Sequence, residues 1–96
     1  FMYAMAVGNY IDMWILVENI PQKITYRLTL SSFEAQLRSL SLKRCHRSYL
    51  VNLKKIENIS GNAQGLKLEL KNRSEVVPVS RKYIPLVRQF FQKHQS

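Results

Sequence analysis

Short segments in which apolar and polar side chains alternate limit the fold of this chain more than any other feature. Residues 66–70 read LKLEL, and residues 23–30 follow the same pattern. In the second segment every other side chain is apolar, at Ile24, Tyr26, Leu28 and Leu30. Strict alternation predicts half-buried strands, because successive side chains of a strand point to opposite faces. We therefore expect a strand-dominated domain, with a basic outer face on the strand over 23–30.

Residues that favour turns divide the rest of the chain into further strands. Gly8–Asn9 separates two apolar segments and predicts a hairpin turn. Residues 20–22, 61–65 and 71–75 are expected as further turns. Pro78 suits the edge or the end of a strand, because proline cannot donate to a strand ladder. Further strands are expected over 1–6, 10–18, 42–45, 56–60 and 76–80. The SYLVN segment over 48–52, YLVN included, is too short and mixed to assign.

Two or three short helices are expected to complete the fold. Ser31 and Glu34 form the pattern of a capping box, which opens a short helix. The apolar positions of this helix are Phe33, Leu37 and Leu40. A second helix is expected at the C-terminus, capped by Ser80. Pro85 is tolerable there only if it lies in the first turn or restarts the helix. Its apolar face is expected to consist of Ile84, Val87 and Phe91.

Charge gives the first indication of function. The 96 residues suit one domain, and no apolar run reaches the ~18 residues that span a bilayer. The net charge is +9, and it is unevenly distributed: residues 23–96 hold all fifteen Lys and Arg against four Glu, a net charge of +11. This excess indicates a polyanionic partner, with nucleic acid the first choice and an anionic membrane surface the second. A merely solubilising surface is the alternative interpretation.

Cysteine and histidine usage argues against an enzyme. A single cysteine excludes an internal disulfide and a four-cysteine zinc site, and it suits a reduced, cytoplasmic protein. Cys45 and His46 are neighbours, and on an extended segment their side chains point to opposite faces, so they cannot form a thiolate–imidazole pair. We expect Cys45 to be packed in the core. Paired carboxylates, a phosphate-binding glycine loop and metal-ligand spacing are missing from the sequence, so we expect no catalytic residues, metal or cofactor.

Two basic clusters are the candidate anion-binding segments. Residues 43–55 contain five Lys and Arg and no acid, and Arg81 and Lys82 follow Ser80 at an expected helix start. The alternative is that Ser80 only caps the helix and Arg81 is solvated. The local sequence therefore leaves the role of this second cluster open. The five tyrosines are dispersed and do not form the paired stacking pattern of an RNA-recognition sheet. The clusters therefore predict polyanion binding by loops, and they do not identify the polyanion.

Three motifs resemble those of LytTR-type DNA-binding domains, the effector domains of a class of bacterial transcription regulators. The family's run aromatic-x-Arg-x-His-Arg-Ser-aromatic-aliphatic-Val-Asn, followed by a basic pair and Ile, is similar to LKRCHRSYLVNLKKI at 42–56. A later element, aliphatic-Pro-Val-Ser-Arg-basic-Tyr, is similar to VVPVSRKYI at 76–84, and an earlier Gly-Asn-Tyr is similar to VGNYI at 7–11. Leu42 stands where the family usually has an aromatic residue. The resemblance extends to about residue 93.

The resemblance implies an elongated, mostly β fold of packed antiparallel sheets that reads double-stranded DNA with loops inserted into successive major grooves. By match to the motifs, Arg47 and Arg81 are expected to read bases, since arginine can hydrogen-bond guanine O6 and N7 together. Asn9 or Tyr10 is a further expected base contact. The expected phosphate contacts are His46, Ser48, Lys54, Lys55, Ser80 and Lys82. Asn52 is expected to be structural, tying a loop to the backbone.

The resemblance also implies partners. It predicts two copies on repeated half-sites, and an upstream receiver domain of the kind found in two-component and quorum-sensing regulators. Residues 1–96 are then one domain, the C-terminal part of a larger regulator, with a first strand expected before Phe1. The alternative function is non-specific binding of a polyanion, either RNA or an anionic membrane surface.

Overall fold

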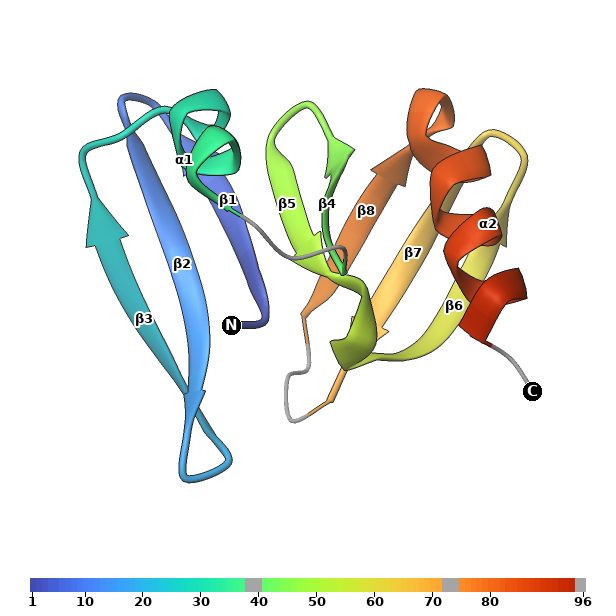
Figure 1. Ribbon diagram of the computed structural model, residues 1–96, viewed down its shortest axis with the longest axis horizontal. Coiled ribbons are helices and arrows are strands. Elements are labelled where there is room, and N and C mark those ends of the chain that lie inside the picture. Colours follow the sequence, from blue (N-terminus) through green and yellow to red (C-terminus); the bar gives the residue numbers. More distant parts are fainter. Residues whose placement is uncertain (38–40, 72–74, 95–96) are drawn as a thin grey trace.

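The computed structural model describes residues 1–37, 41–71 and 75–94, which form two antiparallel β-sheets and two α-helices (Figure 1). The strands are β1 (Tyr3–Val7), β2 (Tyr10–Val17), β3 (Ile20–Tyr26), β4 (Leu42–His46), β5 (Tyr49–Asn52), β6 (Ile56–Asn62), β7 (Gly65–Leu70) and β8 (Val76–Ser80). The helices are α1 (Leu30–Gln36) and α2 (Ile84–His94), with 3-10 turns η1 (Leu53–Lys55) and η2 (Arg81–Tyr83). The predicted strand-dominated fold is confirmed.

The two sheets divide the chain near its middle. The first has five strands in the order β3-β2-β1-β5-β4, and the second has three in the order β6-β7-β8. β7 alternates as predicted, because Leu66, Leu68 and Leu70 are buried while the side chains between them are exposed. The unassigned YLVN segment is β5, which pairs with both β1 and β4. β8 is an edge strand, which accommodates Pro78 as predicted.

The hairpin turns at the two ends of β2 are formed by different residue types. Gly8, in the predicted first turn, has φ +58°, a conformation that glycine adopts without steric cost. Glu18 and Asn19 form the second turn, with φ 54° and 66°, as in a type I′ turn. The turn predicted at 20–22 is therefore wrong, because these residues begin β3. Pro21 is tolerated there because β3 lies at the edge of its sheet.

The strand predicted over 23–30 is too long, because β3 ends at Tyr26 and the chain bends at Arg27. Thr29 is the N-cap of α1, with extended φ −81° and ψ 153°, and its hydroxyl accepts from the Ser32 backbone N–H at 3.1 Å. The predicted capping box is therefore wrong, since Ser31 already lies within the helix. Leu30 is buried at the helix start, and the predicted apolar position Leu40 lies outside the described residues.

The remaining turns and the C-terminal helix follow the prediction with shifted boundaries. The turn expected over 61–65 is confined to residues 63–64, because β6 runs to Asn62 and β7 begins at Gly65. Of the turn expected over 71–75, residues 72–74 lie outside the described part of the chain. Pro85 lies in the first turn of α2 as predicted. Ser80 stands at the N-cap position of η2, but its side chain makes no capping hydrogen bond, so its predicted capping role is wrong.

Two apolar clusters hold these layers together. One lies between the five-stranded sheet and α1, and its buried members are Ala4, Ile11, Leu30 and Leu50. The larger joins both sheets to α2, and its buried members are Met2, Tyr3, Cys45, Val51, Leu53, Leu66, Leu68, Leu70, Val77, Val79, Ile84 and Val87. Because the second cluster takes side chains from β1, β4, β5, β7, β8 and α2, it fixes the two sheets relative to each other.

Candidate nucleic-acid interface

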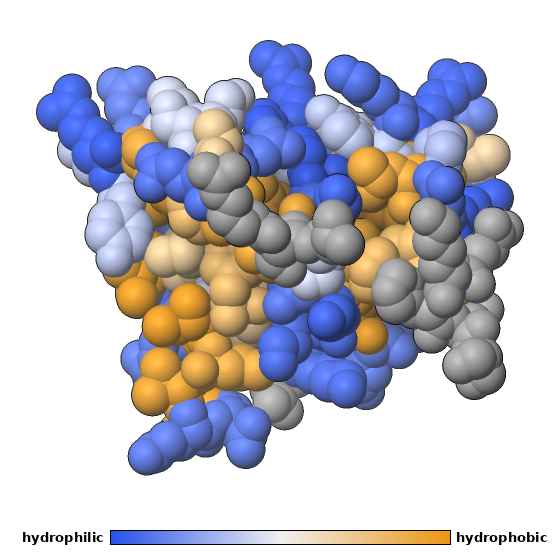
Figure 2. All heavy atoms as spheres, viewed as in Figure 1, coloured by the Kyte–Doolittle hydropathy of each residue, from blue (hydrophilic) through white to orange (hydrophobic). Residues whose placement is uncertain are grey.

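Three exposed turns lie along one edge of the domain, and we call this edge the turn edge. It consists of Gly8–Asn9 between β1 and β2, Arg47–Ser48 between β4 and β5, and Ser80–Lys82 where β8 enters η2, together with the adjoining strand ends Tyr10 and His46. All three lie at the upper side of the view in Figure 1. Figure 2 shows hydrophilic side chains gathered along the same side. Strand topology thus brings together three segments that are far apart in the sequence.

Hydrogen bonds and packing fix the three turns to one another. The Ala6 N–H at the end of β1 donates to the Ser48 carbonyl at 2.8 Å, which ties the first turn to the second. The Cys45 thiol lies 3.6 Å from the Pro78 carbonyl and 3.9 Å from the Tyr49 carbonyl, which ties β4 and β5 to β8. β4 also packs directly against η2. These contacts connect all three turns, so the turns of the turn edge are not independent loops.

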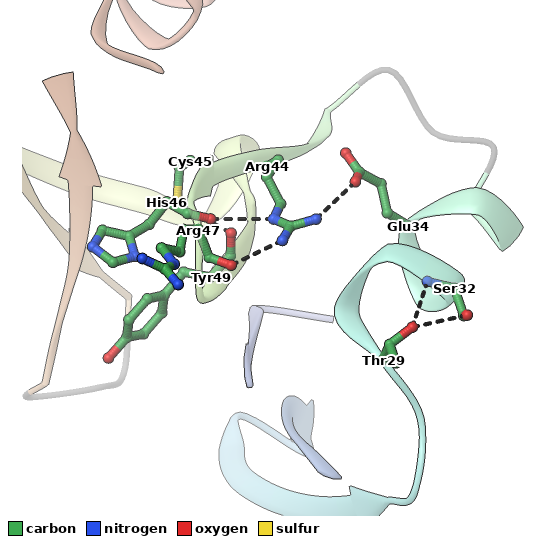
Figure 3. Close-up of polar contacts among 8 residues, drawn as sticks. All are labelled: Thr29, Ser32, Glu34, Arg44, Cys45, His46, Arg47 and Tyr49. Atoms are coloured by element: carbon green, nitrogen blue, oxygen red, sulfur yellow. Dashed lines mark hydrogen bonds and ion pairs between the residues drawn. The ribbon is translucent and has the colours of Figure 1, made fainter. Parts of the chain in front are cut away.

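Arg44 holds the backbone of the β4–β5 turn (Figure 3). Its Nε donates to the His46 carbonyl at 3.2 Å, and its Nη2 donates to the Arg47 carbonyl at 2.8 Å. Its Nη1 donates to Glu34 Oε1 of α1 at 3.1 Å and forms an ion pair there. The basic-cluster interpretation counted Arg44 among the anion-binding residues, but its guanidinium is engaged by the protein itself. In the sequence, the signal for this structural role is the first arginine of the family-like run at 42–56, which is Arg44.

His46 is oriented by the same turn. Its Nδ1 accepts from the Ser48 backbone N–H at 3.1 Å, and its ring meets Tyr49 edge-on with 5.5 Å between ring centroids. A neutral imidazole whose Nδ1 accepts a hydrogen bond carries its proton on Nε2. His46 can therefore donate from Nε2. Burial raises the pKa of the Tyr49 phenol, with a further contribution from Glu75, so this ring stays neutral.

The predicted base-reading residues are all placed on the turn edge. Asn9, Tyr10, Arg47 and Arg81 are exposed, and Tyr10 retains 47% of its accessible surface. Of the predicted phosphate contacts, four lie on the same edge: His46, Ser48, Ser80 and Lys82. The Lys82 ammonium lies 5.4 Å from the centroid of the Tyr83 ring. The turn edge therefore carries basic side chains and hydroxyl groups from segments that are far apart in the sequence.

Lys54 and Lys55 are not brought to this edge. They lie in η1, which follows β5 at the opposite, lower side of Figure 1. The four residues of β5 separate η1 from the β4–β5 turn by about 13 Å, at ~3.3 Å per residue. Asn52 caps η1 by accepting from the Lys54 N–H at 3.1 Å, and it donates to the Phe1 carbonyl at 2.9 Å. The structural role predicted for Asn52 is confirmed.

Cys45 is a core residue, as predicted. It is fully buried, and desolvation raises its pKa from 9.0 to about 12 in spite of the nearby Arg44 charge. It occupies a β-bulge, because the pairing shifts between Arg44 and His46. Its thiol faces the Tyr49 and Pro78 carbonyls, whereas His46 Nδ1 accepts from the Ser48 N–H. The two groups therefore do not form a nucleophile–base pair.

Metal sites and membrane-spanning helices are two other features considered for the described part of the chain. Within residues 1–37, 41–71 and 75–94, no group of three or more His, Cys, Asp or Glu side chains is placed to hold a metal ion. In the same part of the chain, no helix has the length and apolarity needed to cross a membrane.

Comparisons with known proteins give this arrangement a context. Residues 5–92 match the family model described as the LytTr DNA-binding domain. An uncharacterized response regulatory protein of Vibrio cholerae is 43% identical over 68 residues, which cover 71% of this chain and 27% of that protein. One of Vibrio vulnificus is 36% identical over 73 residues, which cover 76% of this chain and 29% of that protein. The chain thus spans less than a third of the length of these relatives.

A solved structure agrees with the sequence matches. It is the LytTr DNA-binding domain of a Bacillus cereus protein described as a methyl-accepting/DNA response regulator. The TM-score is 0.75 at 31% sequence identity, over 94% of this chain and 79% of that one. Fold and matches together define a strand-based DNA-binding domain that presents turns at one edge. The chain belongs to the LytTr DNA-binding domain family, so the resemblance inferred from the three motifs is confirmed.

Proposed function

We propose that this domain binds double-stranded DNA sequence-specifically, as the effector part of a transcription regulator, and that the turn edge is its DNA-binding surface. One observation gives this proposal its main support. Three turns that hold exposed polar and basic side chains are fixed to one another along a single edge. Base reading requires side chains held in a defined geometry, and turns that are connected to one another favour this.

Within this edge we assign separate roles. Arg47 and Arg81 read base edges, because each is an exposed arginine on a turn and can hydrogen-bond guanine at two atoms. Asn9 and Tyr10 read bases from the first turn. His46, Ser48, Ser80 and Lys82 contact phosphates, which positions the domain on the duplex without reading sequence.

The three turns are proposed to enter neighbouring grooves of the duplex. Two facts support this: the turns belong to different strand pairs, and the longest dimension of the domain is 35 Å. One turn of B-DNA is about 34–36 Å long, so a domain of this length can face successive major grooves. Lys54 and Lys55 lie at the other end of β5. They reach phosphates only if the duplex bends around the domain, and we leave them outside the proposed surface.

The function of the whole protein is a further proposal. The curated relatives are response regulatory proteins, and this chain covers 27–29% of their length. We propose that a receiver domain precedes the DNA-binding domain in the full-length protein, and that two copies occupy repeated half-sites. The length and description of the relatives support the receiver domain. The size of the domain supports the two copies, since a single small module rarely buries enough DNA for high affinity.

Selection from a random duplex pool tests the proposal. The domain is expected to enrich one sequence motif, and footprinting of the enriched duplex is expected to show two protected half-sites at the spacing of a helical turn or a multiple of it. Arg81→Ala is expected to lose preference at one base pair of each half-site. Enrichment without a shared motif indicates instead that the positive charge supports only non-specific polyanion binding.

A further inference from the structure

Arg44 combines low exposure with a hydrogen bond from each of its three guanidinium nitrogens. Its side chain retains 19% of its accessible surface, against 44% for Glu34. Nε, Nη1 and Nη2 donate to three different acceptors, two of which are consecutive backbone carbonyls of the β4–β5 turn. A planar guanidinium can meet three acceptors in one plane, and this geometry is not available to an ammonium group. Arg44 is thus shaped to hold a backbone and is poorly placed to bind an external anion.

The turn that Arg44 holds carries the proposed base-reading Arg47. The Arg47 carbonyl accepts from Arg44 at 2.8 Å, so the peptide plane beside the Arg47 Cα is fixed directly. Two further bonds hold the same turn, from Ser48 N–H to His46 Nδ1 and from Ala6 N–H to the Ser48 carbonyl. Neither of these contacts constrains the His46–Arg47 carbonyls. Arg44 therefore adds side-chain hydrogen bonds to these two carbonyls, beside the ladder pairing of His46 with Tyr49.

Glu34 extends the arrangement into α1. Its carboxylate lies 3.1 Å from Arg44 Nη1 and balances the guanidinium charge. Hydrogen bonds between a guanidinium and a carboxylate are shorter and stronger than neutral ones, so the ion pair also favours one guanidinium orientation. The chain of contacts runs from α1 through Arg44 to the turn, as Figure 3 shows.

We propose that Arg44 is a positioning residue that sets the sequence specificity of the β4–β5 turn, and that Glu34 holds it in place. The inference rests on the proposed function. Non-specific affinity depends mainly on the number of charges, which act over about 10 Å at 0.1 M salt. Base reading requires that the position of the reading side chain be held to within about half an ångström. Loss of the guanidinium fork is therefore expected to lower specificity far more than overall affinity.

Arg44→Lys tests this, because it keeps the positive charge and removes the planar fork. Binding to a pool-selected duplex and to a scrambled duplex is measured by fluorescence anisotropy. We expect scrambled-duplex affinity to stay within about twofold of wild type, because the charge is conserved. We expect the selected-over-scrambled ratio to fall about tenfold, the size of one lost base contact. Arg88→Lys on the exposed face of α2 is the matched control, and it is expected to leave both values unchanged.

A double-mutant cycle separates positioning from general destabilisation. If Arg44 acts through Arg47, then Arg44→Lys in an Arg47→Ala background lowers the ratio little further. Additive losses overturn the proposal. An unchanged ratio in Arg44→Lys also overturns it while leaving the proposed function intact. A wild-type ratio near one refutes the proposed function, and this inference with it.

A second pair of measurements covers the case in which Arg44→Lys does not fold. Glu34→Gln leaves the guanidinium in place and replaces its charged acceptor by a neutral one, so a smaller loss of the ratio in the same direction is expected. In wild-type protein, the Arg44 Nε–H is expected to exchange slowly with solvent in NMR spectra, in contrast to Arg88 Nε–H. Fast exchange at Arg44 combined with an unchanged ratio in Glu34→Gln refutes the positioning role.

Discussion

The thiol of Cys45 offers a quantitative test of how firmly the two sheets are held together. The Cys45 side chain extends from β4 towards β8 and is fully buried there. Desolvation raises its pKa from 9.0 to about 12. At pH 8, a thiol with the ordinary value is deprotonated in roughly one molecule in ten, and one with the raised value in roughly one in ten thousand. Since the thiolate is the reactive form, the native thiol is expected to react about a thousandfold more slowly than the unfolded one.

The assay is the rate of reaction with a disulfide reagent at pH 8, in native buffer and in denaturant. A native rate within about tenfold of the unfolded rate would refute the reasoning. It would mean that the core between β4 and β8 opens readily, and that the turns of the turn edge are not held together by it.

The same shift predicts a pH dependence of stability. A group whose pKa is higher in the folded state contributes stability below its unfolded value of 9.0, and this contribution disappears as the pH rises towards about 12. A rise of the thiol pKa from 9.0 to about 12 corresponds to roughly 4 kcal/mol of unfolding free energy at most. The difference in unfolding free energy between wild type and Cys45→Ala should therefore shrink between pH 9 and 12, because only the wild type has the thiol. A constant difference contradicts the burial argument.

Four further predictions concern the turn edge and its support. Arg81→Ala and Arg47→Ala should each cost ~1–3 kcal/mol on a selected duplex and blur preference at one base pair, and unchanged binding of either variant contradicts its assignment. Lys82→Ala should weaken all duplexes about equally and reduce the slope of log affinity against log salt by ~1. The matched variant Lys55→Ala should leave that slope unchanged, and an equal drop indicates DNA that wraps to the far end of β5. Asn52→Ala should lower the unfolding free energy by ~1–2 kcal/mol in urea titrations, since it removes one cap and one backbone contact, and a loss below ~0.3 kcal/mol contradicts its structural role.

Local patterns predicted the strands well, because alternation and turn residues act over a few neighbouring positions. The alternation at 66–70 is enough to define β7, whose side chains face one core and one solvent side. Where the pattern failed, two local signals competed. The alternation over 23–30 continues beyond the end of β3, since Leu28 and Leu30 contact the core near and within α1. Thr29 and Ser31 are both good N-caps by residue type. Thr29 is the N-cap because the chain bends at Arg27 and the helix begins at Leu30.

The candidate site was predicted in part. The motif matches placed Arg47 and Arg81 correctly on exposed turns, but they could not show that β8 returns beside β4. The basic run at 43–55 looked like one cluster in the sequence. The structure divides it, because β5 carries the chain away from the turn before Lys54 and Lys55. The role of Arg44 depends on Glu34, ten residues away on a different element, so residue type alone suggested an anion ligand.

The most direct test of the central claim is the salt dependence of specificity. Fluorescence anisotropy on a pool-selected and a scrambled duplex, from 50 to 300 mM salt, separates base reading from electrostatic attraction. If the turn edge reads sequence, the selected duplex is preferred by ~10³-fold or more, and the preference persists at the highest salt. Equal binding of the two duplexes that disappears with added salt contradicts the claim, and it assigns the +9 net charge to non-specific binding alone.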